Sequence, residues 1–220
     1  GFSLANAGST SATGTIIDDE TGTVGFDSSA TKISVTESDG SVQPPDIVLS
    51  KTSDEDVRVD YRAVASSGSA SSSDFNEVTS GTVTITQGQI STSLPSISIN
   101  DDSIFDNGGE NFFVELTSAQ TVASGSSLGL TTGEESHEIT IADDETAPTV
   151  SVASASTTEG GDADFTVTLS NKVDEAVSGN FTVSAGTATS TDFSNGTLPT
   201  GTFTFAAGDT TTNVIISTAQ

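Results

Sequence analysis

The chain has 220 residues, a hydrophobic content of 32%, and a formal net charge of −26 from 31 acidic and 5 basic side chains. Binding to nucleic acids or to anionic membranes needs clustered Lys and Arg, so this charge argues against both partners. The chain has no Cys, which excludes disulfides and thiolate metal sites, and no apolar run approaches the roughly 18 residues of a membrane span.

Short runs that alternate apolar and polar residues recur along the chain and predict β-strands. They include residues 83–85, 97–99, 165–169 and 203–205. Only alternate residues of such strands face the core, so a modest hydrophobic content is compatible with a folded all-β protein. High charge with modest hydrophobicity is also typical of disorder. The regular runs favour folded modules, and the Gly, Asn and Ser turns between them favour antiparallel, immunoglobulin-like β-sandwiches.

Two acidic phrases have nearly the same sequence, and each follows an apolar, alternating run. They are Gly14-Thr-Ile-Ile-Asp-Asp-Glu20 and Glu138-Ile-Thr-Ile-Ala-Asp-Asp-Glu145. Asp18 and Asp143 are 125 residues apart, which is about the length of one domain. A fixed period of this length predicts a tandem array of modules.

Taken as boundaries, the acidic phrases divide the chain into three pieces. We expect residues 1–20 to be the final strands of a preceding module, residues 21–145 a complete module, and residues 146–220 the first strands of a following module. Three explanations of the partial ends stay open. The chain is a window from a longer array, a proteolytic fragment, or a filament subunit in which one copy's first strands complete the last module of another.

The second and third pieces share an ordered set of motifs. Ser73-Asp-Phe75 matches Thr191-Asp-Phe193, and the Gly-Thr strand at 81–88 matches residues 201–208. This order resembles the Calx-beta domain, an immunoglobulin-like sandwich found in the sodium–calcium exchanger, in integrin β4 and in many bacterial surface proteins. The resemblance covers essentially the whole chain. It implies a tandem Calx-beta protein of the bacterial surface or adhesin type, with one complete and two partial modules.

The resemblance also implies a calcium site at one end of the middle sandwich. In the family, calcium is held by a Glu after the first strand, the Asp of the Asp-aromatic phrase, an acidic loop and the closing Asp cluster. The equivalent residues of this chain are Glu37, Asp74, Asp101, Asp102, Asp106, Glu110, Asp143 and Asp144.

Elementary chemistry agrees with such a site, because Ca²⁺ takes 6–8 oxygen ligands and loops at one end of a sandwich bring distant carboxylates together. The chain departs from the family pattern at Asp106, where Glu is more common, and at Gly108-Gly109, which lengthens the loop. The competing interpretation is a solvated loop end without a fixed ion.

Further acids are secondary candidates for metal binding. The last piece retains only part of the ligand set, and the first acidic phrase could contribute to a joint with the middle module. These residues are Asp18, Asp19, Glu20, Glu145, Glu159 and Asp192.

No catalytic residues are predicted. His137 is the only His, and a lone imidazole makes neither a catalytic triad nor a transition-metal cluster, so we interpret it as an ordinary surface or strand residue. Paired carboxylates could serve a glycosidase, but the chain has no Trp to form a sugar platform.

The sequence therefore predicts a non-enzymatic, calcium-binding structural or adhesion module of an extracellular surface protein, with calcium stiffening loops and joints. A calcium-sensing regulatory module is the alternative, and a carbohydrate-binding or hydrolytic module is a third class. The expected partners are calcium, neighbouring modules or other copies of the chain, and a cell-surface or matrix ligand.

Overall fold

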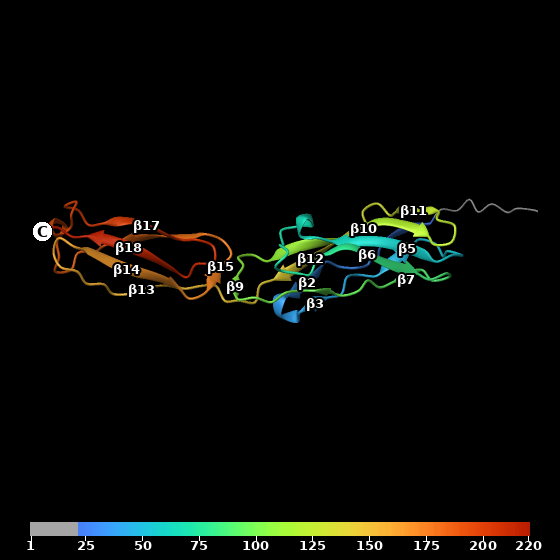
Figure 1. The fold of residues 1–220 in the computed structure, drawn as a ribbon, viewed down its shortest axis with the longest axis horizontal. Coiled ribbons are helices and arrows are strands. Elements are labelled where there is room, and N and C mark those ends of the chain that lie inside the picture. Colours follow the sequence, from blue (N-terminus) through green and yellow to red (C-terminus); the bar gives the residue numbers. More distant parts are fainter. Residues whose placement is uncertain (1–21) are drawn as a thin grey trace, which may run out of the picture.

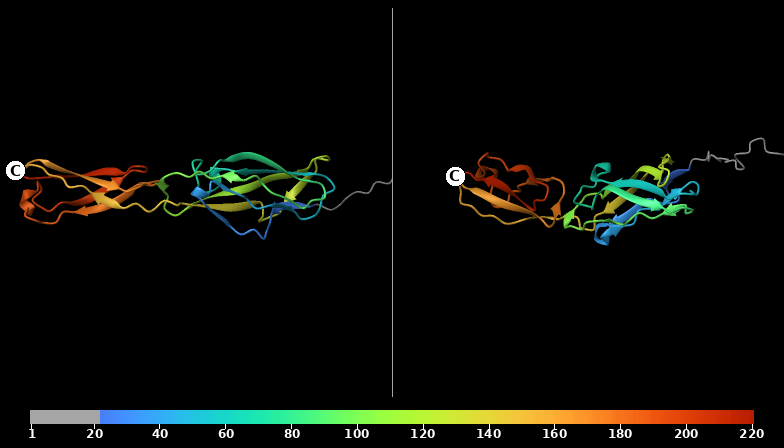
Figure 2. Two further views of the ribbon diagram at one scale, coloured as in Figure 1. Left: turned by 90° about the horizontal axis from the view of Figure 1, so that it is seen from below. Right: turned by 45° about the vertical axis from the view of Figure 1, so that its right-hand side comes forward.

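The computed structural model describes residues 22–220, which form two elongated β lobes arranged end to end (Figure 1). The lobes remain end to end in both further views, and the right-hand view shows an angle between them (Figure 2). The all-β class predicted from the sequence is confirmed, because the ordered elements are strands and three short 3-10 turns. No helix in the described part of the chain is long and apolar enough to cross a membrane.

The first lobe is a sandwich with two layers of strands. Its strands are β1 (Thr23–Phe26), β2 (Ile33–Thr36), β3 (Ser41–Val42), β4 (Ile47–Leu49), β5 (Val57–Ala63), β6 (Val78–Ile85), β7 (Ser91–Thr92), β8 (Ile97–Ser98), β9 (Ile104–Phe105), β10 (Glu110–Thr121), β11 (Ser127–Leu130) and β12 (Ser136–Ala142). Two 3-10 turns, η1 (Glu37–Asp39) and η2 (Ala65–Ser67), lie between strands.

Strand β10 organises the first lobe because it takes part in both layers. It pairs with β5 and β12 in one layer, and its last residues pair with β11, which also pairs with β1 of the other layer. The register between β10 and β5 shifts between Leu116 and Ser118, where a bulge bends the long strand. The result is one continuous nine-stranded sheet folded over a single core.

The core of the first lobe follows from strand alternation. On β5, Val57, Val59, Tyr61 and Ala63 are buried, and the residues between them are not. Each inward residue removes a Val- or Leu-sized side chain from water, which stabilises the fold by about 1.5–3 kcal/mol per side chain. Near the end of the lobe, Phe75 and Phe112 stack with ring centroids 4.0 Å apart. This stack packs the segment between η2 and β6, which contains Phe75, against strand β10.

The second lobe has the same strand order with fewer strands among its residues. Its elements are β13 (Val150–Val152), β14 (Asp162–Leu169), β15 (Lys172–Val173), β16 (Val177–Thr182), η3 (Ser190–Asp192), β17 (Thr200–Phe205) and β18 (Thr211–Ser217). Strand β14 pairs with β13 and β18, and β16 pairs with β17. Val167, Leu169 and Phe205 are fully buried between these two small sheets.

Both lobes use the same contact between an aromatic ring and a glycine on paired strands. Tyr61 lies opposite Gly81, and Phe181 lies opposite Gly201. A Cβ atom added at Gly81 would lie 2.3 Å from the Tyr61 ring, and one at Gly201 would lie 2.7 Å from the Phe181 ring. Each ring therefore covers a glycine, which explains why the Gly-Thr motif recurs in both pieces.

The two lobes are joined by more than the connecting segment. Strand β9 of the first lobe pairs in parallel with β15 of the second, with Ile104 opposite Lys172 and Phe105 opposite Val173. The Phe105 side chain packs against the core of the second lobe. The joint is therefore a small interface that contains both backbone pairing and apolar contact.

Candidate metal centre

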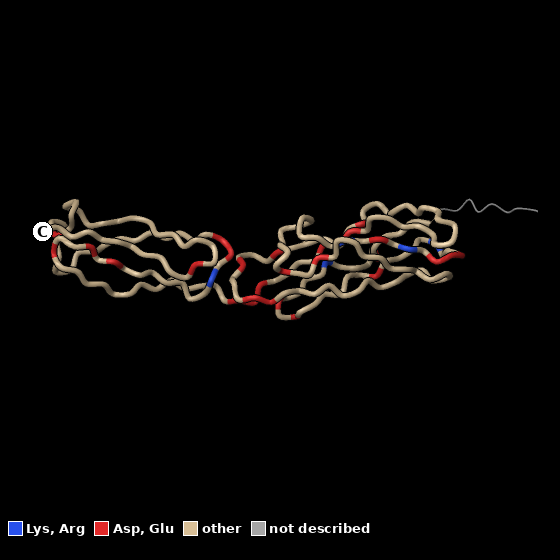
Figure 3. The backbone as a smooth tube through the Cα atoms, viewed as in Figure 1, with Lys and Arg blue, Asp and Glu red and all other residues tan. Residues whose placement is uncertain are grey.

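Acidic residues gather at the end of the first lobe that faces the second (Figure 3). Strands β2 and β12 are parallel neighbours, with Thr36 opposite Ala142. Because parallel strands leave the sheet at the same edge, the residues that follow them, Glu37 and Asp143, emerge side by side. The sheet topology therefore brings together two acidic segments that are about one hundred residues apart in sequence.

Glu37 is the one buried charged residue in the described part of the chain, with a relative exposure of 5%. It begins η1, which is held by a hydrogen bond from the Thr36 backbone N–H to Asp39 Oδ2 (2.9 Å) and ends at Gly40 in the left-handed region (φ 71°). Burial, followed by the charges of Asp102 and Asp106, raises the pKa of Glu37 to about 7. Its carboxylate is therefore buried among other acids.

The closing acidic phrase contributes directly to this group. One carboxylate oxygen each from Glu37, Asp144 and Glu145 lie within 4.8 Å of one another. Oδ1 of Asp143 and Oε2 of Glu145 are buried and have no hydrogen-bond donor. Burying a carboxylate oxygen without a donor is costly unless a cation compensates it. Burial and the neighbouring Asp143 raise the pKa of Glu145 as well.

The loop from Asp101 to Glu110 covers one side of the group. Asp102 Oδ1 accepts the backbone N–H of Ile104 (2.7 Å), which turns the chain into β9. Burial, then the charges of Asp174 and Asp102, raises the pKa of Asp106 to about 6. Gly109 has a φ of 69°, and a Cβ there would lie 3.0 Å from the Ile141 carbonyl oxygen, so this glycine lets the loop lie close to β12.

This loop and the end of β12 enclose a surface depression. Its lining includes Phe105, Asp106, Asp143 and Glu145, with the two glycines of the loop at its rim. The depression is open to solvent beside the joint, so an ion could enter it without unfolding of either lobe.

Asp74 and Glu110 form a second pair of acids beside the group. Burial, a hydrogen bond with Asp74 and the Asp74 charge raise the pKa of Glu110 to about 8. Burial by itself would raise the pKa of Asp74. Hydrogen bonds with Glu110 and Ser71 outweigh that effect, so the pKa of Asp74 is lowered. Of the two carboxyls, Glu110 therefore has the stronger tendency to be protonated and Asp74 the stronger tendency to be ionised.

The structure brings together most of the predicted ligands, but not all of them. Asp101 is exposed and is not one of the three residues whose carboxylate oxygens converge around Glu37. Glu159 and Asp192 flank the opposite end of the second lobe, where Ala219 bonds to the neighbouring Gly160 and to Asp192. Asp18, Asp19 and Glu20 lie outside the described residues. Which of the predicted ligands bind a metal stays a prediction.

One acidic residue at the joint was not predicted from the sequence. Asp174 follows β15 in the second lobe, and its charge raises the pKa values of Asp106 and Glu110 across the joint. The family pattern could not indicate it, because that pattern covers the ligands of a single module. The available signal was the internal repeat, in which Asp54-Glu55 and Asp174-Glu175 hold equivalent positions.

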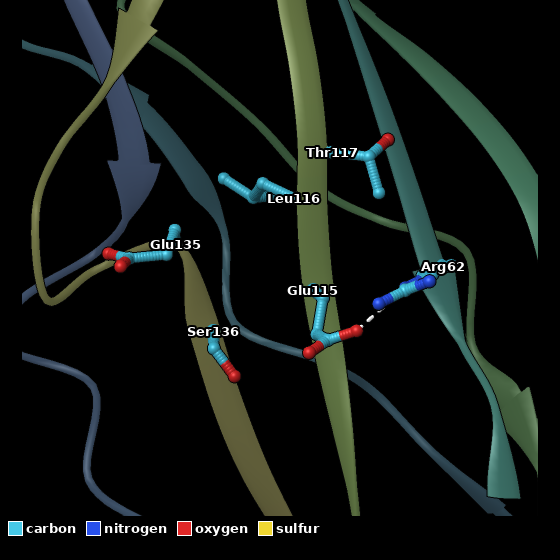
Figure 4. A pocket seen from close by; sticks show the side chains of 6 residues that line it. All are labelled: Arg62, Glu115, Leu116, Thr117, Glu135 and Ser136. Atoms are coloured by element: carbon cyan, nitrogen blue, oxygen red, sulfur yellow. Dashed lines mark hydrogen bonds and ion pairs between the residues drawn. The ribbon is translucent and has the colours of Figure 1, made fainter. Parts of the chain in front are cut away.

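Two other features lie away from the metal centre. His137 is half-buried on β12, with its ring 5.8 Å from that of Phe26, and burial lowers its pKa. A second depression is lined by Arg62, Glu115 and Glu135 among others (Figure 4). There, Arg62 Nε donates to Glu115 Oε2 across β5 and β10 (2.7 Å). Neither feature assembles a nucleophile with an activating base.

Comparison with known proteins decides the family. The family model of the Calx-beta domain matches residues 18–145 and again residues 142–220. The chain belongs to the Calx-beta family. Calx-beta domains are calcium-binding regulatory or structural modules. A comparison with curated protein sequences found no match.

Solved structures of Calx-beta domains are similar to this chain. The crystal structure of CBD12 from CALX1.2 has a TM-score of 0.47 and 17% identity, covering 89% of this chain and 74% of its own. The crystal structure of the apo-form Calx CBD1 domain has a TM-score of 0.46 and 19% identity, covering 57% of this chain and 100% of its own.

The acidic group of this Calx-beta chain fits a hard divalent cation. Its donors are carboxylate oxygens alone, which suit Ca²⁺ and Mg²⁺ rather than the softer metals that favour His and Cys. The donorless oxygens of Asp143 and Glu145 and the buried Glu37 are the groups that a cation would satisfy. Ca²⁺ tolerates irregular sites with many ligands better than Mg²⁺ does, so the crowded geometry favours calcium.

Proposed function

We propose that this chain is a calcium-binding structural segment of an extracellular tandem array, in which calcium stiffens the joint between modules. One observation carries the proposal. Carboxylates of Glu37, Asp144 and Glu145 converge at the end of one module where the next begins, and Glu37 is buried there. Buried oxygens of Asp143 and Glu145 at the same place have no hydrogen-bond partner. Without a cation these groups repel one another, so calcium stabilises the closed arrangement of the loop and the joint.

The extracellular setting is supported by the acidic charge and by the physical demands of such a site. Extracellular modules commonly bind calcium with dissociation constants of about 10⁻⁴–10⁻³ M, where the ion is permanently bound and serves as a clamp. A charge of −26 also keeps a repetitive surface protein soluble and separate from its neighbours. The proposal involves no catalytic step, in keeping with the regulatory and structural roles of the family.

Calorimetric titration of the whole chain with CaCl₂ after chelation tests the proposal. We expect binding, and a melting temperature that rises with calcium, because ligands that bind the native state stabilise it by mass action. A variant with Glu37→Gln removes the buried carboxylate, and Asp162→Asn at the far end of the second lobe serves as the charge-matched control. Absence of calcium binding by the unmodified chain would refute the proposal.

The measured affinity separates the structural role from the regulatory alternative. Dissociation constants near 10⁻⁴–10⁻³ M support a permanent clamp outside the cell. Values of about 10⁻⁷–10⁻⁵ M, which are typical of intracellular sensors, would instead favour a calcium-sensing module.

A further inference from the structure

The joint places two like charges opposite each other on different modules. In the parallel pair of β9 and β15, Ile104 is opposite Lys172 and Phe105 is opposite Val173. The next position of this register sets Asp106 beside Asp174. The Asp174 backbone N–H also donates to the Phe105 carbonyl oxygen (3.4 Å), which fixes the start of this segment against the first lobe.

Packing holds Asp174 in this position. Val173, the residue before it, is buried in the core of the second lobe, and its carbonyl oxygen accepts the N–H of Gly208 (2.8 Å). From the other side, Phe105 packs into the same core. Each acidic residue therefore follows a residue that is anchored in the joint, so their backbones are held close to each other.

In the described part of the chain, neither carboxylate of this pair forms an ion pair with a Lys or Arg. After burial, Asp174 is the largest contributor to the raised pKa of Asp106, ahead of Asp102 and Asp143. Within residues 22–220, the ion pairs of Lys and Arg involve Asp60, Glu115 and Glu138, and none involves Asp106 or Asp174. Like charges that face each other on paired strands destabilise the pairing, and here that pairing joins two modules.

Independent features of the same end of the lobe indicate a cation. Asp106 lines the depression that also contains Asp143 and Glu145, whose buried Oδ1 and Oε2 atoms lack donors. Glu37, with 5% exposure, converges with Asp144 and Glu145. Asp174 is exposed on the second module, directly after the strand pair that joins the lobes.

We propose that Asp174 is a calcium ligand contributed by the second module, so that the bound ion is shared between the two lobes through Asp106 and Asp174. This inference rests on the proposed function. A shared ion converts the repulsion at the joint into an attraction. It makes closure of the joint dependent on calcium rather than on the small β9–β15 interface alone.

The internal repeat supports a general role for this position. Leu49 to Val57 and Leu169 to Val177 have the same length, and Asp54 and Asp174 hold the same place within them. Both lobes thus carry an Asp at this place in the repeat. In a tandem array, this Asp would face the closing acidic phrase of the preceding module.

The test compares Asp174→Asn with Glu175→Gln in the full 220-residue chain. The two changes remove the same charge from adjacent residues, so only a direct ligand role separates them. Calcium affinity and stoichiometry are measured by calorimetry. Bound Eu³⁺ is used as a probe, because its luminescence lifetimes in H₂O and D₂O report coordinated water.

We expect Asp174→Asn to weaken calcium binding at one site by on the order of tenfold or more, and to admit an additional water to bound Eu³⁺. Glu175→Gln should stay close to the unmodified chain in both measurements. Without calcium, Asp174→Asn should raise the melting temperature, because it relieves the repulsion with Asp106. Asp174→Ser, which also lacks the carboxylate, should reproduce the loss.

Two outcomes overturn the inference in distinguishable ways. If the unmodified chain binds calcium and Asp174→Asn binds it equally well, or if both variants lose affinity to the same extent, Asp174 is not a ligand and the proposed function stands. If the unmodified chain binds neither calcium nor Eu³⁺, the proposed function fails together with the inference.

Discussion

Glu37 shows how a single residue couples burial, charge and metal binding. Its position after β2 places a carboxylate next to the end of β12, where water is largely excluded. A buried carboxylate among other acids is unfavourable on its own, so its presence is better explained by a bound cation than by stability of the metal-free fold.

Glu37→Gln should therefore have opposite effects with and without calcium. Without calcium, near pH 8, we expect the free energy of unfolding to rise by about 1–3 kcal/mol, because an isosteric neutral group replaces a repelled charge. With calcium, the variant should lose most of the stabilisation that the ion provides. Urea unfolding in calcium and in chelator measures the free energy of unfolding under both conditions. A variant that is destabilised equally in the two buffers would contradict this account.

The stability of the metal-free chain should fall as the pH rises. The pKa values of Glu37, Asp106 and Glu110 are raised to about 7, 6 and 8, from unfolded values of 4.5, 3.8 and 4.5. At pH values between the unfolded and the folded pKa of each group, the native state binds more protons than the unfolded state. The free energy of unfolding therefore decreases as the pH rises. Their contribution is fully present near pH 4 and is lost by about pH 8.

Thermal unfolding in chelator between pH 4 and pH 8 measures this slope. Calcium should remove most of it, because a bound cation stabilises the ionised carboxylates at the higher pH. A melting temperature that rises with pH in the absence of metal would contradict the prediction.

At the scale of the elements, the aromatic rings over Gly81 and Gly201 explain a motif that is visible in the sequence. The Gly-Thr strands recur because a ring from the paired strand occupies the space of the missing Cβ. The repeated motif indicated equivalent strands in both pieces, whereas the reason for the glycine became visible only with Tyr61 and Phe181 in place.

Gly81→Ala should destabilise the first lobe by about 1–3 kcal/mol, because the new Cβ would lie 2.3 Å from the Tyr61 ring and force a shift of packed atoms. The matched control is Gly129→Ala on β11, where the nearest atom, Thr23 Cγ2, would be 3.7 Å away. That control should change stability by no more than about 0.5 kcal/mol. The midpoints of urea unfolding compare the two, and similar effects would contradict the role assigned to the ring.

At the scale of the whole molecule, a short strand pair and one aromatic side chain connect two lobes that have separate cores. An interface of this size holds an orientation weakly, so the angle between the modules depends on what else acts at the joint. The acidic group lies at this joint. Calcium would therefore affect the angle between the lobes more than the packing of either core.

Chelation should make the chain less extended and more variable in shape. Small-angle scattering of the whole chain is expected to show a broader distance distribution in chelator than in calcium. Phe105→Ala should produce part of this change even with calcium, because it removes the apolar contact between the lobes at a cost of about 1–2 kcal/mol for a half-buried ring. Identical scattering with calcium and with chelator would rule out a calcium-stiffened joint.

The sequence by itself determined the all-β class, the family and the repeated motifs, because these depend on local alternation, turn residues and spacing along the chain. It also indicated the carboxylates of the middle module as a set, although their division into ligands and bystanders stays a prediction. Only the tertiary structure decided that Glu37 is buried while Asp101 is exposed, and that Asp174 of the next module lies beside Asp106. Burial and pairing between modules depend on contacts between distant segments, which no local pattern encodes.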